Sequence, residues 1–291
     1  MRRPHVRSLA VLGGILALAM VPVNVVAGPD HRGGVIYDST VTPLPGNLPS
    51  VGAEAYSFTE FGDEVTFVGH SRVLRQVTVT LSSWACQAGN WHDDNCVTSK
   101  GATFVTPITF NLYQPATVAG VPTAGSLIAT QTDAFTIPYR PSADDVHCNF
   151  VNADTGAGPP SGEWYDGNKG CFNGIAANIT FDFSAQNVAL PDTVVFGIAY
   201  DTSDYGPHPI SVSLCRTTPE GCSYDSLNIG LAPRVKVGSK PFPNTVFQNA
   251  VYPGDYCDNG AAGVALLRED SPSNACWAGY VPAVQFTAEQ S

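Results

Sequence analysis

Residues 77–82 have the sequence Val-Thr-Val-Thr-Leu-Ser, in which every second side chain is apolar. Successive side chains of a β-strand point to opposite faces, so this alternation predicts a strand with one buried and one wet face. No segment keeps the i, i+3, i+4 apolar spacing of an amphipathic helix, so an all-β chain with very little helix is expected. The same period of two recurs at residues 108–113, 177–183, 194–200, 210–214 and 227–231.

Turn residues separate these strands. Gly and Pro make up 51 of the 291 residues (28 plus 23) and cluster between the apolar runs. Many short strands with such turns, and without crossover helices, favour an antiparallel β-sandwich or jelly roll. Two connections, residues 141–173 and 238–260, are too long for hairpins, and long loops on a rigid scaffold often carry function. No linker interrupts residues 28–291, which are predicted to form a single β-sandwich domain.

Residues 1–27 have the layout of a secretory signal peptide. Three arginines within the first seven residues precede a mostly apolar run that ends in small residues. This order predicts cleavage after Ala27 and export of the rest of the chain. The alternative is an uncleaved membrane anchor, which glycines and a proline inside the run disfavour because a span needs about 20 uninterrupted apolar residues. We therefore expect a secreted, extracellular protein with no membrane insertion after cleavage.

The charge of the chain limits its partners. The formal net charge is −11, and it becomes −14 without residues 1–27, because that segment holds three arginines and no acid. An acidic surface repels phosphate backbones and anionic membrane surfaces, so nucleic acid is excluded as a partner. Hydrophobic residues make up 44% of the chain, which argues against disorder. A monomer with a large core is expected.

All eight cysteines follow the predicted signal peptide and form four neighbouring couples. An even number of cysteines in an exported chain predicts disulfides, and long cysteine-free stretches between the couples favour local bridges. A zinc cluster, the alternative, would need CxxC-type spacing, which is absent. The predicted bridges are Cys86–Cys96, Cys148–Cys171, Cys215–Cys222 and Cys257–Cys276.

Sequence motifs of hydrolases are missing: the chain has neither G-x-S-x-G nor H-E-x-x-H. Glycosidase carboxylates meet only in space and leave no such motif. Glu163, beside Trp164, is the one candidate catalytic acid, and the alternative is an exposed loop carboxylate. Acid-rich loops also suit structural calcium, although no EF-hand pattern is present. No other cofactor is expected, and no metal ligand is assigned.

Aromatic residues gather in the predicted loops, several of them beside cysteines. Their rings stack on the C–H faces of sugars, and nearby carboxylates supply directional hydrogen bonds. Loops at one end of a sandwich converge, so we expect a glycan-binding surface held rigid by disulfides. The alternative is that the rings pack over the disulfides as small cores, and Trp84 is predicted to belong to the core. The predicted members of the surface are Trp91, Trp164, Tyr205, Trp277, Asp93, Asp94 and Asp204.

Several strand segments together resemble a known group of proteins. They are Val-Ile-Tyr-Asp at 35–38, Phe-Gly-Asp at 61–63, the strand at 77–84, Phe-Asn-Leu-Tyr at 110–113 and Phe-Gly-Ile-Ala-Tyr at 196–200. These strand sequences are similar to those of uncharacterised exported bacterial β-sandwich proteins, over about residues 34–288. The resemblance implies secretion and a sandwich fold. It includes no functional motif and therefore implies no site residue.

The sequence favours a secreted, non-catalytic binding or cell-surface protein whose ligand is a carbohydrate or cell-envelope glycan. Two alternatives stay open, namely a secreted hydrolase that acts on polysaccharide and a purely structural envelope protein. A close pair of carboxylates at the base of a groove would favour the hydrolase. A set of aromatic rings without such a pair would favour the binding protein.

Overall fold

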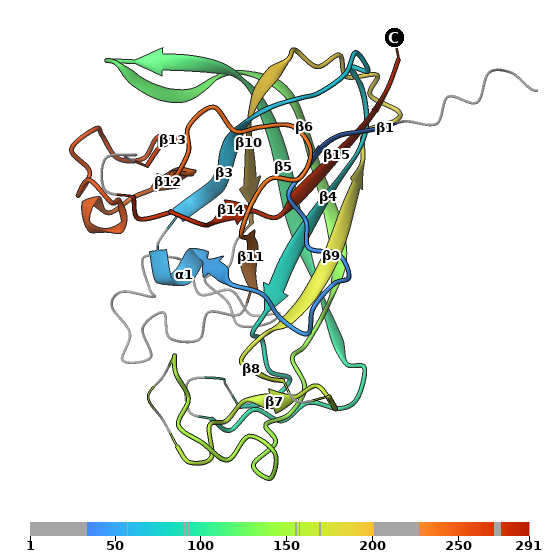
Figure 1. The fold of residues 1–291 in the computed structure, drawn as a ribbon, viewed down its shortest axis with the longest axis vertical. Helices are drawn as coiled ribbons and strands as arrows, with labels where there is room; N and C mark the ends of the chain where they lie inside the picture. The colour runs from blue at the N-terminus through green and yellow to red at the C-terminus, as the bar shows by residue number, and fades with distance from the viewer. Residues whose placement is uncertain are drawn as a thin grey trace, which may run out of the picture. The chain divides into compact units, whose positions relative to one another are not determined.

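The computed structural model describes residues 34–56, 58–89, 91, 94–154, 156, 158–168, 170–200, 227–270 and 275–290. Over these residues the regular secondary structure is almost entirely antiparallel β-strand (Figure 1), which confirms the all-β prediction. Helix in this part of the chain is limited to α1 (Ala53–Tyr56) and the 3-10 turn η1 (Pro253–Asp255). The predicted signal peptide and the predicted strand at residues 210–214 lie outside the described residues.

The first sheet is built around β4 (Val73–Ser83), which contains the alternating stretch at residues 77–82. β4 pairs on one side with β9 (Ile175–Asp182) and on the other with β15 (Val284–Glu289) and β11 (Leu227–Ala232), all antiparallel. The remaining strands of this sheet are β1 (Gly34–Asp38), β2 (Ser50–Gly52) and β14 (Val281–Pro282).

The two faces of β4 differ from the expected pattern at one end. Val77, Val79 and Leu81 are fully buried, as the alternation predicts. Thr80 and Ser82 are fully buried as well, although a wet face was expected there. The reason is that other segments cover this end of the strand: Ser82 Oγ donates to Asn47 Oδ1 at 2.7 Å, from the segment that leads into β2.

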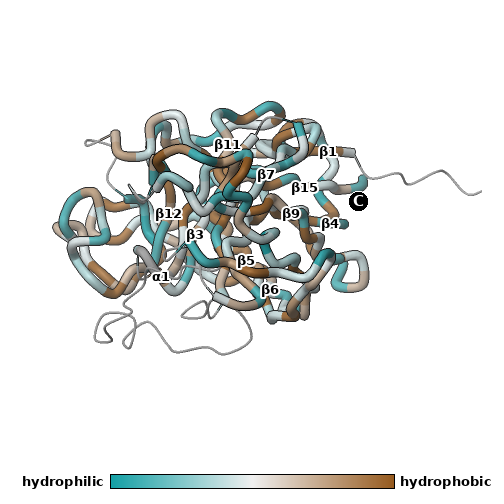
Figure 2. Tube along the Cα trace, turned by 90° about the horizontal axis from the view of Figure 1, so that it is seen from below, coloured by the Kyte–Doolittle hydropathy of each residue, from teal (hydrophilic) through white to brown (hydrophobic). Residues whose placement is uncertain are grey.

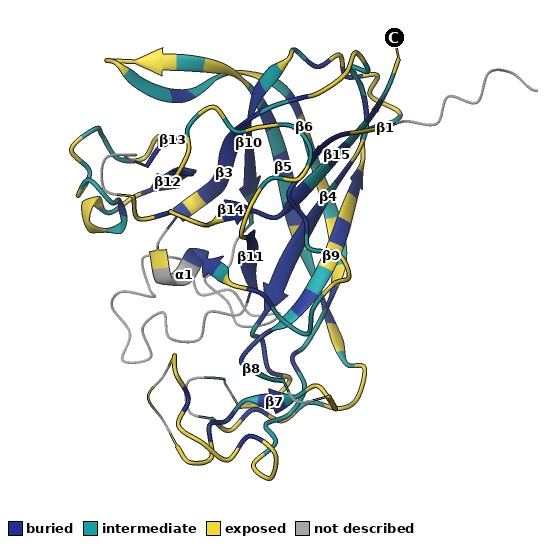
Figure 3. Cartoon of the chain, in the orientation of Figure 1, coloured by how far each residue is buried: buried dark blue, intermediate teal, exposed yellow. Residues whose placement is uncertain are grey.

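The second sheet closes into a small barrel. In barrel order the strands are β10 (Thr193–Ala199), β3 (Phe58–Thr66), β12 (Phe247–Ala250), β13 (Arg268–Glu269), β6 (Val121–Pro138) and β5 (Thr103–Val118). The barrel closes because β13 bridges β12 and β6, with Arg268 paired to Thr123. β5 and β6 form a long hairpin that turns through Ala119 and Gly120, both at positive φ, as a two-residue hairpin turn requires. The tip of this hairpin is exposed (Figure 3).

The core lies between the two sheets. Phe286 of β15 and Phe181 of β9 meet Phe110 of β5, with ring centroids 5.8 and 5.5 Å apart. Phe196 of β10 stacks on Phe110 at 5.6 Å. Such pairs add about 0.5–1.5 kcal/mol each beyond the burial of apolar area. Figure 2 shows apolar and polar residues interspersed along the trace.

The disulfide prediction is confirmed for three couples. Cys86–Cys96, Cys148–Cys171 and Cys257–Cys276 are bonded, whereas Cys215 and Cys222 lie outside the described residues. Disulfides of this kind indicate an oxidising, extracellular-type environment. Where the structure describes the chain, no helix is long and apolar enough to cross a membrane.

The two long loops contain short strands that the sequence does not announce. Residues 141–173 include β7 (Trp164–Tyr165) and β8 (Cys171–Phe172), which pair with each other. Residues 238–260 include β12, which pairs with β3 in the barrel. Strands of two to four residues are too short to show a period of two, so the prediction of plain loops is corrected here.

Candidate binding site

A cavity of about 750 Å³ opens between the first sheet and the loop segments around β8 and η1. Its walls come from seven separate parts of the sequence, namely the β2 region, the end of β4, Asp154, β8, β11, the η1 region and residues 276–280. The lining is dominated by rings: Tyr56, Trp84, Phe172, Tyr256, Trp277 and Tyr280.

One disulfide holds two of these rings. Tyr256 directly precedes Cys257 and Trp277 directly follows Cys276, so the Cys257–Cys276 bridge ties both rings to one wall. Trp277 is only 7% exposed, and its ring lies 5.4 Å from that of Phe61 in the main core. Its Nε1 donates to Asp270 Oδ2 at 2.7 Å. The Tyr256 hydroxyl accepts the backbone N–H of Ala250 at 2.9 Å, so both rings have fixed orientations.

Trp84 follows the end of β4, and Phe172 belongs to β8. Trp84 Nε1 donates to Ser82 Oγ at 2.9 Å, and the Trp91 ring packs edge-on against Trp84 at 4.7 Å. A side chain at Gly174 would come within 2.5 Å of the Trp84 ring, so only glycine leaves room for it. Trp84 is therefore a half-buried cavity residue, which corrects the prediction that it belongs to the core.

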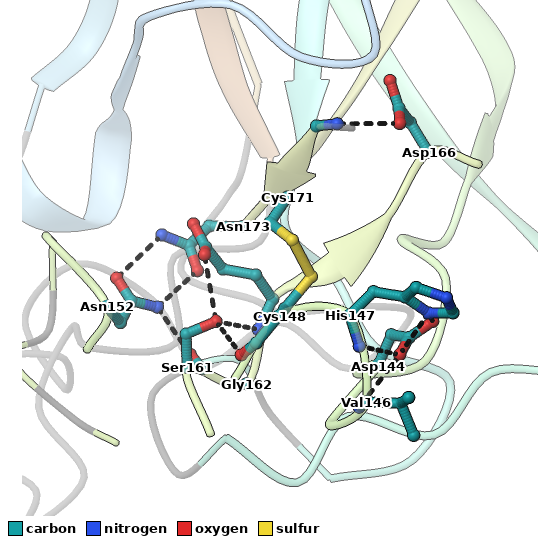
Figure 4. The surroundings of a disulfide bond; sticks show 12 residues. Asp144, Val146, His147, Cys148, Asn152, Ser161, Gly162, Asp166, Cys171 and Asn173 are labelled. Carbon is teal, nitrogen blue, oxygen red and sulfur yellow. Dashed lines mark hydrogen bonds and ion pairs between the residues drawn. A yellow bond between two sulfur atoms is a disulfide. The ribbon is translucent and has the colours of Figure 1, made fainter. Parts of the chain in front are cut away.

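Asn152, Ser161 and Asn173 form a buried hydrogen-bond network (Figure 4), and this network holds the carboxylate of Asp154 at the rim of the cavity. Asn173 Nδ2 donates to Asp154 Oδ2 at 2.6 Å, and Asn152 Nδ2 donates to Asn173 Oδ1 at 2.9 Å. Asn152 also donates to the carbonyl of Ser161 at 2.8 Å. The Cys148–Cys171 bridge closes the loop that carries this network. A rigid rim lowers the ordering cost of binding.

A second carboxylate, Asp255, lies on the η1 side of the cavity and is half-buried. Behind the same wall, the Arg268 guanidinium lies 4.0 Å from the centroid of the Tyr256 ring and pairs with Asp258 at 2.9 Å. Burial alone would raise the pKa of Asp258, but the hydrogen bond and charge of Arg268 and the backbone N–H groups of Ala262 and Gly260 together lower it. Burial raises the pKa of Asp270, against the hydrogen bonds from Trp277 and the backbone of Cys257.

The predicted surface is only partly assembled. Trp277 lines the cavity, and Trp91 backs it through Trp84. Trp164 does not line it: the residue is 7% exposed and its Nε1 donates to the carbonyl of Gly174 at 2.6 Å, so its prediction as a surface ring is corrected. Asp94 is half-buried against Gly162, outside the lining. Tyr205, Asp93 and Asp204 lie outside the described residues.

Sequence reasoning missed most of the actual lining. Tyr56, Phe172 and Tyr280 also line the cavity, but apart from being aromatic they have no sequence feature that predicts this position. Tyr256 had the same signal as Trp277, a place directly beside a cysteine, and could have been found by it.

Glu163 does not lie in the cavity. Ser161 Oγ donates to Glu163 Oε2 at 3.0 Å, and the side chain is half-buried, where an exposed loop acid had been the alternative. Burial raises the pKa of Glu163, with Ser161 acting in the opposite direction. Its neighbours include the buried Arg140, whose Nη2 bonds to the carbonyl of Gly162. These contacts indicate a structural role in the loop.

A close group of acids lies in the barrel instead. Asp63, Glu64 and Glu269 are all at least 93% buried, and Asp63 pairs with Lys240 at 2.6 Å. Burial, followed by the charges of Asp63 and Glu269, raises the pKa of Glu64 to about 7. Burial raises the pKa of Asp63 to about 6, although Lys240 opposes the shift. None of these acids lines the cavity.

This group makes stability depend on pH. Glu64 ordinarily titrates near 4.5, so between that pH and about 7 the folded state holds more protons than the unfolded state. The contribution of Glu64 to stability is then greatest below pH 4.5 and is lost as the pH rises through 7. We expect the free energy of unfolding to fall by about 2 kcal/mol. This is less than the full pKa shift implies, because solvent screens part of the interaction. Urea unfolding at pH 5 and pH 8 measures this loss.

Glu64→Gln mimics the protonated acid. Its free energy of unfolding should equal that of the wild type at pH 5 and exceed it at pH 8. Asp133→Asn removes a charge on β6 outside this group and serves as the control. If both variants gain equal stability at pH 8, general charge repulsion explains the effect. The explanation by the buried acid group would then be wrong.

Comparison with family models, with curated proteins and with solved structures finds no match to this chain. In the part of the chain that the structure describes, no group of three or more His, Cys, Asp or Glu side chains is placed to hold a metal ion. The site is therefore interpreted from its own chemistry.

Proposed function

We propose that this protein is an exported glycan-binding protein that holds sugar rings in the aromatic cavity. The observation that carries the proposal is the convergence of six aromatic side chains from distant parts of the sequence on one cavity. Sugar rings offer apolar C–H faces to such rings and hydroxyls to the polar rim. The volume falls within the range of about 300–1,000 Å³ that is typical of small-molecule sites.

The placement of the acids supports binding rather than hydrolysis. A general acid needs a pKa raised toward the working pH. Among the described carboxyl groups, those whose pKa rises to 6 or 7 are Asp63 and Glu64, in the barrel and outside the lining. Export is part of the proposal, supported by the predicted signal peptide and the three disulfides. N-terminal sequencing of protein from the culture medium should then begin at Gly28.

Retention on insoluble polysaccharide tests the proposal. Tyr56 and Tyr280 are 42% and 41% exposed, so alanine at these positions removes rings from the cavity with little loss of core. We expect the double variant to lose about tenfold in retention, because each stacked ring contributes about 0.5–1.5 kcal/mol. Thermal unfolding checks that the variant stays folded.

Phe150→Ala is the matched control. Phe150 is 45% exposed but does not line the cavity, so its loss should leave retention unchanged. Equal losses for both variants would locate binding elsewhere. Release of soluble sugars from the polysaccharide would instead favour the hydrolase.

A further inference from the structure

The charged residues that line the cavity have one sign. Asp154 and Asp255 are acids, and the described lining includes no Lys, Arg or His. Asn173 Nδ2 donates to Asp154 Oδ2 at 2.6 Å, and Asp255 lies in the turn η1. A site for neutral sugars needs no excess of acidic over basic residues. Hydroxyl and amide side chains of the protein can both donate hydrogen bonds to such sugars and accept hydrogen bonds from them.

The groups directly behind the wall keep this sign. Asp270 accepts from Trp277 Nε1, and Arg268 pairs with Asp258 behind Tyr256. With Asp154 and Asp255, these groups are four carboxylates and one guanidinium, a net charge of −3. The whole chain adds a field of the same sign, with a formal net charge of −11. A cavity of one sign concentrates ligands of the opposite charge.

The aromatic rings reinforce this preference. The faces of Trp and Tyr rings carry negative potential and attract cations, Trp most strongly. A carboxylate that accepts the indole N–H, as Asp270 does from Trp277 at 2.7 Å, places further negative charge at the ring edge. One face of Tyr256 is already engaged by Arg268. The other five lining rings remain to meet a ligand cation: Tyr56, Trp84, Phe172, Trp277 and Tyr280.

We propose that the cavity selects sugars that carry a protonated amine, so that the polymer bound is a glycan rich in free glucosamine. The inference rests on the proposed function and names its ligand class. The amine would lie between the carboxylates and the ring faces, and the pyranose C–H faces would stack on the remaining rings. Glycans built on uronic acids or sulfated sugars would be repelled.

Three tetrasaccharides with the same β-1,4-linked backbone provide the test. The tetramers of glucosamine, N-acetylglucosamine and glucose differ only at C2, where they carry an ammonium, an acetamide or a hydroxyl group. Isothermal titration calorimetry of residues 28–291 at pH 6 should show the glucosamine tetramer binding at least tenfold more tightly than the other two. The advantage should shrink at pH 8.5, where the amine loses its proton.

Variants separate the cavity from the general charge of the protein. Asp154→Asn with Asp255→Asn should remove the advantage of the glucosamine tetramer over the glucose tetramer, and thermal unfolding shows that the variant is folded. Asp133→Asn with Asp145→Asn makes the same change of charge outside the lining and should leave the advantage intact.

The outcomes distinguish the two proposals. Equal affinity for all three tetramers would overturn the amine preference and leave glycan binding standing. If both double variants lose the advantage of the glucosamine tetramer equally, the advantage comes from the overall charge of the protein. This result would also overturn the amine preference of the cavity. Absence of binding by any tetramer would overturn the preference, and absence of retention on every polysaccharide would overturn glycan binding itself.

Discussion

Trp277→Ala is expected to destabilise the protein by about 3–5 kcal/mol, the usual cost of deleting a large buried ring. Trp277 is 7% exposed, packs against Phe61 in the main core and also lines the cavity. The alanine variant leaves a void on both sides and removes the N–H that satisfies Asp270. Its melting temperature should fall by about 10 °C. Urea unfolding at pH 7 measures the free energy directly.

Trp277→Phe is the matched variant. It keeps a ring against Phe61 and removes only the indole N–H, so we expect a loss of about 1–2 kcal/mol. If the alanine variant were as stable as the wild type, Trp277 would not join the core to the cavity wall, and the packing described above would be wrong.

Removing the Cys148–Cys171 bridge is expected to cost about 3 kcal/mol, because the bridge closes a loop with a sequence separation of 23. The loop carries Asn152 and Ser161, whose bonds hold the rim of the cavity. Cys148→Ser with Cys171→Ser should therefore lower both the stability and the affinity for glycan. Denaturant unfolding and titration of the same sample measure the two losses.

Hydrogen exchange localises the effect of this change. The amide of Ser161 donates to the carbonyl of Cys148 at 2.9 Å and should lose protection in the double serine variant. Amides of β4 and β9 should keep theirs, since those strands pair independently of the loop. An unfolding free energy within about 1 kcal/mol of the wild type would contradict the expected contribution of the bridge.

The sheets were predictable because their signal is local. The period of two in residues 77–82 marks β4, and the predicted segments 108–113 and 227–231 lie within β5 and β11. Closure of the barrel was not predictable, because it depends on β13, a strand of two residues. The disulfides followed from the spacing of cysteines, since short loops bring their ends together readily.

The site was predictable only where a covalent landmark lay nearby. Trp277 was predicted as a site residue beside Cys276 and lines the cavity, and the same landmark marks Tyr256. Trp84 was predicted to be a core residue and lines the cavity, whereas Trp164 was predicted to be a surface ring and is buried. The sequence does not separate the two cases, because strand ends and loops alike can face a cavity or a core. Long-range packing decides between them: Gly174 leaves room for the Trp84 ring, and its carbonyl accepts the Trp164 indole N–H.

The most direct test of the glycan site uses the indole N–H signals of the protein's four tryptophans. A ¹H–¹⁵N spectrum of residues 28–291 is recorded while the glucosamine tetramer is titrated in. The signals of Trp84 and Trp277 should shift and saturate together, because both line the cavity. The signal of Trp164 should stay in place, since its indole is buried against Gly174. Saturable binding that shifts Trp164 and leaves Trp84 and Trp277 unchanged would contradict the proposed site.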